Sequence, residues 1–280
     1  MKDILVSICC LTYNHEKYIR QCIESFLLQE TNFSFEILIH DDASKDGTVN
    51  IIREYEKNYP DLIKPIYQSV NQYSQGVRPS FKYNFPRAKG KYIAMCEGDD
   101  YWTDPKKLQK QVDFLEKNTE YVLCGHHVGR DIDGEIKFPT ALHFKSFDQS
   151  EICINHIPTL SAVFKNKIKH YPEDISTIPY GDFFMWVTLG AYGKFAILPE
   201  IMANYRVHEA GMWSGESQIM RLKNSIKSRT VAAKYISESK DLTFKDIKKR
   251  AKKGLKLAIK STKVNDAFFF LKVLFASKHG

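Results

Sequence analysis

The 280-residue sequence lacks the features that mark several common classes of protein. Its six cysteines show no CxxC pairing and lie mostly inside apolar runs, which predicts buried, reduced thiols in a cytosolic protein. No apolar run reaches the roughly 20 residues that span a bilayer. The first expected strand–helix turn carries no GxGxxG fingerprint, and the sequence has no Walker P-loop. A dinucleotide-binding or P-loop interpretation is therefore weak.

Basic charge is concentrated at the end of the chain. Residues 215–280 hold 17 Lys and Arg against 5 Asp and Glu, a balance of +12, whereas residues 1–214 hold 24 against 28. A mildly acidic body argues against a nucleic-acid partner for it, and an anionic partner of the basic end would be membrane lipid, RNA or a protein. We expect one domain over 1–214 and a basic helical extension over 215–280.

Apolar runs alternate with helical patterns in the first hundred residues. Runs at 4–11, 35–40 and 91–96 have the length and composition of buried strands, and helical periodicity separates them. This alternation predicts an α/β fold with a mostly parallel sheet flanked by helices. We interpret the first run as a strand rather than a signal peptide, because Asp3 interrupts the basic end and no small-residue cleavage site precedes the polar residues after it.

Polar and acidic residues stand where these strands are expected to end. Thr12-Tyr13-Asn14 follows the first strand, Asp41-Asp42 the second, and Glu97-Gly98-Asp99-Asp100 the third. Ligands of open α/β sheets bind at this edge. Carboxylates so close together repel unless a cation or donors lie among them, and Mg²⁺ or Mn²⁺ bridging to phosphates is the usual solution. The alternatives are helix caps and a solvated acidic turn.

The second half of the chain offers single candidates. Asp182 opens an apolar helix, where it is either a cap or, among aromatic neighbours, a partly desolvated general base. His208 lies in a glycine-containing loop and is a candidate metal ligand or diphosphate contact. The adjacent His126 and His127 lie on an expected strand, so they point to opposite faces and we assign them structural or solvent-facing roles.

The basic end predicts three helices, at about 216–238, 243–260 and 264–276. The segment Phe268-Phe269-Phe270 makes the last of them apolar nearly all round, but it is too short to span a bilayer. Two outcomes are open for these phenylalanines. They pack against the body or against a second copy in a homodimer, or they anchor the protein at an anionic membrane surface together with the basic helices.

Four elements together resemble an inverting nucleotide-sugar glycosyltransferase of family 2, which has the GT-A fold. They occur in the order of that family and extend over about residues 4–214. They are the opening Val6–Asn14, the block Glu36–Thr48, the segment Glu97–Trp102, which resembles the DxD motif, and Gly181-Asp182, which resembles the acidic dyad that carries the catalytic base.

The resemblance implies a role for each matching residue. Thr12, with Tyr13 and Asn14, and one of Asp41 and Asp42 would hold uracil and ribose. Asp99 and Asp100 would contact the ribose and Mn²⁺ or Mg²⁺, with His208 as a further metal or diphosphate contact, and Asp182 would be the base. The weaker candidates for the donor and acceptor pocket are Glu97, Trp102, Gly181 and Trp213. The sequence departs from the family at Glu97, the first DxD position, and at Gly181, where the dyad has an acid.

The expected activity is transfer of a hexose or N-acetylhexosamine from a UDP-sugar or other nucleotide-sugar to the hydroxyl of a saccharide or lipid-linked acceptor in surface polysaccharide synthesis. A single carboxylate base favours one displacement and hence inversion. A nucleotidyltransferase is the alternative enzyme, but it needs a glycine-rich triphosphate loop; a non-catalytic binding module is the third. We expect a cytoplasmic protein, peripheral on the inner face of the membrane if its basic end binds lipid.

Overall fold

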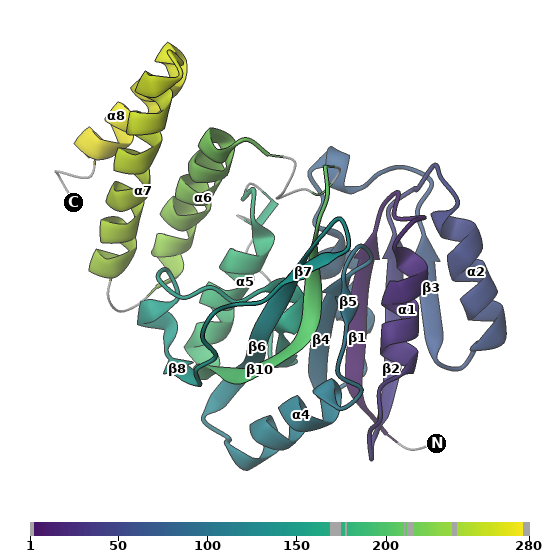
Figure 1. Ribbon diagram of the computed structural model, residues 1–280. Coiled ribbons are helices and arrows are strands. Elements are labelled where there is room, and N and C mark those ends of the chain that lie inside the picture. The colour runs from purple at the N-terminus through teal and green to yellow at the C-terminus, as the bar shows by residue number, and fades with distance from the viewer. Residues whose placement is uncertain are drawn as a thin grey trace. The chain divides into compact units, whose positions relative to one another are not determined.

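The computed structural model describes residues 3–168, 175–176, 178–209, 211, 216–236 and 240–276. The chain divides into two compact units (Figure 1). The first comprises Met1–Ser146, Ile157–Tyr171 and Tyr192–Val207, and the second comprises Phe147–His156, Pro172–Ala191 and His208–Gly280. These units are defined by contacts within the fold. The expected division into a domain over 1–214 and an extension over 215–280 stays a prediction.

In the described part of the chain, ten strands form one sheet, in the order β3-β2-β1-β4-β9-β6-β10-β5, with β7 on β6 and β8 on β10. The strands are β1 (Ile4–Thr12), β2 (Ser34–Asp41), β3 (Ile63–Tyr67), β4 (Tyr92–Glu97), β5 (Tyr101–Trp102), β6 (Tyr121–Ile132), β7 (Glu135–Lys137), β8 (Lys145–Phe147), β9 (Val163–Lys165) and β10 (Lys194–Val207). Neighbours from β3 to β4 are parallel, as are β6 and β10, while β9 runs antiparallel between β4 and β6.

The central strands are buried because apolar residues occupy both of their faces. Val6, Ile8 and Cys10 of β1 are fully buried, and so is Cys9 except for 2% of its surface. Such continuous apolar runs are typical of parallel strands that are covered on both sides. The covering helices are amphipathic: α1 buries Ile19, Cys22, Ile23 and Phe26. The predicted α/β fold is confirmed.

The helices of the first unit are α1 (Ile19–Leu27), α2 (Thr48–Asn58), α3 (Phe85–Arg87) and α4 (Lys107–Lys117). Those of the second are α5 (Gly181–Leu189), α6 (Gln218–Ala232), α7 (Lys240–Lys260) and α8 (Val264–Ala276). The last three correspond to the three helices expected at the basic end. All six cysteines are buried and free, as predicted.

Helices α6, α7 and α8 lie side by side (Figure 1). They share a small apolar core. Phe270 is fully buried in it and Phe269 packs against it, whereas Phe268 is 59% exposed. Phe270 therefore packs against its neighbouring helices and does not face a membrane surface, because α8 must bury one side against α7. No helix in the described ranges has both the length and the apolar content that crossing a membrane requires.

Candidate nucleotide and metal site

The strand register brings three of the predicted motifs to one edge of the sheet. Thr12 at the end of β1 pairs with Asp41 of β2, and Leu11 pairs with Glu97 at the end of β4. The chain reaches β2 on one side of β1 and β4 on the other, so the strand order reverses at β1. Ligands of open α/β sheets bind outside such a reversal.

The segment after β4 turns sharply and gathers its carboxylates. The Asp100 N–H donates to the Glu97 carbonyl at 3.0 Å, and the Gly98 N–H donates to the Leu11 carbonyl at 2.7 Å. As a result, one carboxylate oxygen each of Glu97, Asp99 and Asp100 lies within 4.8 Å of the other two. Oxygen ligands at this spacing suit a hard divalent cation.

Asp100 is the most buried member of this carboxylate cluster, with 1% of its surface exposed. Burial raises the pKa of Asp100 well above its usual range, and the charges of Asp99 and Glu97 raise it further. The Arg206 N–H opposes this shift by donating to Asp100 Oδ1 at 2.8 Å. A bound cation would offset this repulsion and favour the ionised form of Asp100, so the cluster fits a cation site.

Gly98 lets the turn lie directly against the end of β1. A Cβ on Gly98 would lie 2.7 Å from Thr12 Oγ1, closer than real Cβ atoms approach, and 3.0 Å from His15 Nδ1, which is also a tight contact. Thr12 Oγ1 is buried and has no hydrogen-bond partner within the described residues. Because buried hydroxyls are normally paired, this orphaned group beside the carboxylates points to a ligand that supplies its partner.

Asp41 and Asp42 are buried and hold adjacent loops. Asp41 accepts from the Ser44 N–H at 3.0 Å, and burial raises the pKa of Asp41. Asp42 accepts from the backbone N–H groups of Gln72 at 2.7 Å and Tyr73 at 2.9 Å. Both carboxylates therefore fix the backbone at the edge of the site, and Asp42 brings the 72–73 segment to it.

The turn after β1 is joined to the loop after β2. Asn14 adopts a positive φ of 55°, its N–H donates to Ser44 Oγ at 2.9 Å, and its Oδ1 accepts from the Lys45 N–H at 2.8 Å. Tyr13 is 42% exposed beside it. Asn14 thus shapes the wall of the candidate site, and Tyr13 remains accessible to a ligand.

Trp102 differs in placement from the other predicted residues of the first unit. It is 3% exposed, its indole N–H donates to the Leu160 carbonyl at 3.0 Å, and its ring packs on Phe26 at 4.7 Å. The structure thus places Trp102 in the core behind the carboxylate turn, where it supports β5. His126 is fully buried on β6, in agreement with a structural role.

The remaining candidates belong to the second unit. Gly181 and Asp182 form the start of α5, and Asp182 Oδ1 accepts from the Phe183 N–H at 2.7 Å. His208 follows β10 and accepts through its carbonyl from the Gly211 N–H. Trp213 lies outside the described residues. The roles of Asp182 and His208 stay predictions.

Two residues that sequence reasoning did not assign to the site lie beside the carboxylates. His15 Nε2 is 3.8 Å from Asp99 Oδ2. The Arg206 guanidinium donates to the Asp99 carbonyl at 2.6 Å and lies over the rings of Tyr18, 5.0 Å away, and Tyr101, 4.4 Å away. The available signal was proximity in sequence: His15 follows the Thr12 turn, and Arg206 lies two residues before His208.

An α/β sheet with a carboxylate cluster at its strand-order reversal belongs to the class of folds that bind ligands at the carboxyl edge. Comparison with known proteins identifies the family within this class. The family model for glycosyl transferase family 2 matches residues 7–185, and the chain belongs to this family. The predicted membership is thereby confirmed.

The curated relatives match part of the chain. An uncharacterized Mycobacterium tuberculosis protein is 38% identical over 212 residues, which cover 74% of this chain and 60% of the relative. A putative teichuronic acid biosynthesis glycosyltransferase of Bacillus subtilis, TuaG, is 31% identical over 145 residues, covering 50% and 55% of the two chains. The chain thus spans about three fifths of the mycobacterial relative's length.

Solved structures share the fold at low identity. S. aureus TarS 1-349 in complex with UDP-GlcNAc superposes with a TM-score of 0.72 at 15% identity, over 98% of this chain and 81% of that one. The mannosyltransferase PcManGT from Pyrobaculum calidifontis, in complex with GDP-Man and Mn²⁺, gives 0.61 at 14% identity, over 99% and 89%. These similarities confirm the predicted GT-A fold.

Proposed function

We propose that the protein transfers a sugar from a nucleotide-sugar, with UDP as the expected nucleotide, to an acceptor hydroxyl with inversion at the anomeric carbon. The observation that carries the proposal is the cluster of Glu97, Asp99 and Asp100 at the sheet edge of a family 2 chain, beside the Thr12 hydroxyl, which has no hydrogen-bond partner among the described residues. Related chains with this fold have been solved with UDP-GlcNAc and with GDP-Man plus Mn²⁺.

In this proposal the nucleoside lies along the ends of β1 and β2. Thr12 Oγ1 forms a hydrogen bond with the base or the ribose, and one of Asp41 and Asp42 accepts a hydrogen bond from the imide N–H of uracil. Tyr13 is exposed enough to cover the base. Asn14 holds the turn between them through its bonds to Ser44 and Lys45.

Asp99 and Asp100, together with Glu97, would hold the divalent ion, and His208 is a further candidate contact. When bound, Mn²⁺ or Mg²⁺ would neutralise charge on the departing diphosphate. Arg206 keeps the carboxylates in place, since its backbone N–H bonds Asp100 and its guanidinium bonds the Asp99 carbonyl. The protein supplies an electrostatic environment aimed at the leaving group.

Asp182 is the proposed general base. It accepts the proton of the acceptor hydroxyl as the acceptor oxygen bonds to the anomeric carbon, and the bond from that carbon to the diphosphate oxygen breaks, so that UDP leaves with the electron pair. With Gly181 in place of a second acid, Asp182 acts alone. The sugar is a hexose or N-acetylhexosamine, and the acceptor is a saccharide or lipid-linked saccharide of a surface polymer.

The test of the base is Asp182→Asn, which keeps the shape and the bond to the Phe183 N–H but cannot take a proton. With a donor found by screening UDP-GlcNAc, UDP-glucose and GDP-mannose in Mn²⁺, turnover should fall roughly 10²–10⁴-fold with little change in UDP affinity. Asp61→Asn, on an exposed residue, removes the same charge as a control. Turnover by Asp182→Asn equal to that of the control would reject Asp182 as the base.

A further inference from the structure

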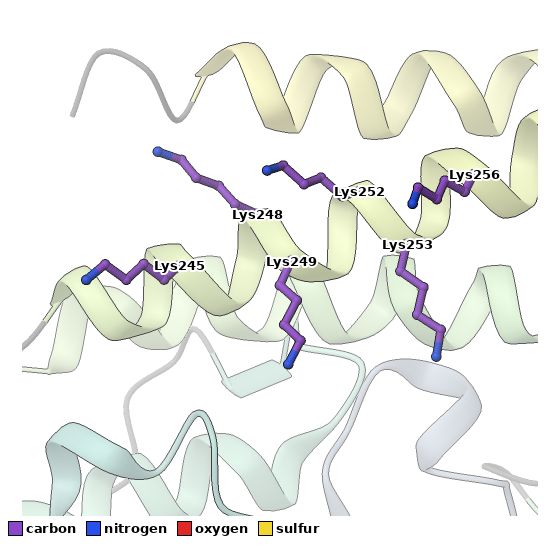
Figure 2. Close-up of a pocket in the computed structure, with 6 residues that line it drawn as sticks. All are labelled: Lys245, Lys248, Lys249, Lys252, Lys253 and Lys256. Atoms are coloured by element: carbon purple, nitrogen blue, oxygen red, sulfur yellow. The ribbon is translucent and has the colours of Figure 1, made fainter.

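Helix α7 carries a continuous surface of lysines. Six residues line one shallow surface depression, namely Lys245, Lys248, Lys249, Lys252, Lys253 and Lys256, and we call them the lysine face. Each follows another by three or four positions, so they share one side of the helix. Figure 2 shows all six side chains extending from α7. At 1.5 Å per residue the lysine face is about 17 Å long.

The opposite side of α7 fixes this orientation. Ile247, Ala251 and Ala258 are buried among α6, α7 and α8, and Gly254 lies against the ring of Phe270. A rotation of α7 that turned the lysine face inward would expose this core. The lysines are therefore held outward by packing rather than by contacts of their own.

The lysine face has no carboxylate partner among the residues that the structure describes. In the ranges that the structure describes, none of the six ammonium groups lies within 4.0 Å of a carboxylate. Asp246 of the same helix forms ion pairs with Arg229 and Arg250, and the Nε atom of each arginine lies 2.6 Å from Asp246 Oδ2. Each lysine has a like-charged neighbour one turn away, which disfavours the helix. An anionic surface along the helix would relieve this repulsion.

Apolar side chains lie at both ends of the same helix. Phe244 is 37% exposed before the lysine face, and Ile259 is 65% exposed after it. The neighbouring helix α8 adds Phe268 and Phe275, which are 59% and 62% exposed. A dissolved polyanion would need only the charges, whereas a bilayer surface accepts both cationic and apolar side chains at the headgroup boundary.

We propose that the lysine face binds the surface of a bilayer containing anionic phospholipids. The ammonium groups lie at the level of the lipid phosphates, and Phe244 and Ile259 enter the headgroup boundary at the two ends. The helix lies along the surface rather than crossing it. This proposal does not depend on the sugar transfer proposed above, because its contacts involve none of the site residues.

The test is sedimentation of the full chain with vesicles of equal parts phosphatidylcholine and phosphatidylglycerol, and with vesicles of phosphatidylcholine alone. The triple variant K249Q, K252Q and K256Q removes three charges from the lysine face while keeping good helix formers. The matched control, K57Q, K89Q and K117Q, removes three charges from exposed lysines of the first unit. Circular dichroism and melting curves establish that both variants fold.

We expect the wild type and the control to bind the anionic vesicles and not the neutral ones, with binding that weakens as salt rises. At roughly fivefold per lysine, the lysine-face variant should bind about a hundredfold more weakly. Equal binding by both triple variants would overturn the proposal, as would binding of the wild type to neutral vesicles. Retention on soluble polyphosphate without vesicle binding would overturn it in favour of a dissolved polyanion.

Discussion

One buried histidine of the first unit, His40, contributes to the pH dependence of the protein's stability. His40 of β2 is fully buried, and within the described part of the chain neither ring nitrogen has a hydrogen-bond partner. Burial lowers its pKa to about 4, and the nearby Asp42 only partly offsets this. His40 is therefore neutral in the folded protein at any pH where the site would work.

The pKa of His40 predicts a loss of stability in acid. The imidazole of His40 takes up a proton at about pH 6.5 in the unfolded chain and only at about pH 4 in the folded chain. The contribution of His40 to the free energy of unfolding is therefore fully present above pH 6.5 and is lost as the pH falls toward 4. The loss from this group is about 3 kcal/mol. Urea unfolding at pH 7 and pH 4.5 should show a larger drop for the wild type than for His40→Leu. An equal drop in both would contradict the assignment.

At the scale of single elements, the packing of α7 on α8 depends on Gly254. A Cβ at this position would lie 2.3 Å from ring atoms of Phe270. Glycine costs a helix about 1 kcal/mol relative to alanine, so its presence in mid-helix needs a compensating contact. That contact is the buried Phe270 ring, which closes the core of the three C-terminal helices.

Gly254→Ala should accordingly destabilise the protein by about 1–3 kcal/mol, in spite of the better helix propensity of alanine. Combining it with Phe270→Leu should cost less than the sum of the two single changes, because the smaller side chain makes room for the new methyl group. Lys253→Ala, at an exposed neighbouring position, serves as the control. Urea unfolding measures all four variants, and a stabilised Gly254→Ala would show that the two helices do not pack closely.

Local sequence patterns predict some of the secondary-structure elements but not how distant strands pair. Asp and Gly are residue types that favour tight turns, and Asp133 and Gly134 both adopt positive φ, 52° and 88°, between β6 and β7. Buried strands and amphipathic helices were equally visible. The antiparallel insertion of β9 between β4 and β6 was not, because pairing between distant segments depends on the whole sheet rather than on periodicity.

The part of the candidate site that lies within one short segment could be predicted from the sequence. Glu97, Asp99 and Asp100 are near neighbours in sequence, so the cluster follows from the turn that ends β4. Arg206 lies two residues before the candidate His208, but the sequence does not show that it reaches Asp99 and Asp100 from β10, more than 100 residues later. The burial of Phe270 could not be predicted for the related reason that an apolar run does not show which of its faces is covered.

At the scale of the whole molecule, the proposed function requires that the carboxylate cluster of Glu97, Asp99 and Asp100 bind a nucleotide diphosphate through a divalent ion. Asp99→Asn removes one charge from the cluster and keeps its shape. Asp113→Asn, at an exposed carboxylate of α4, is the matched control, since it removes the same charge away from the sheet edge. Folding of each variant is checked by its melting curve before binding is compared.

The most direct measurement is calorimetric titration of UDP into the full chain with Mn²⁺ and again with a chelator. We expect the chelator to weaken UDP binding at least tenfold, about 1.4 kcal/mol, for the wild type and for Asp113→Asn. Asp99→Asn should bind UDP weakly in both conditions. Equal UDP affinity of the wild type with and without Mn²⁺ would contradict a metal at Glu97, Asp99 and Asp100.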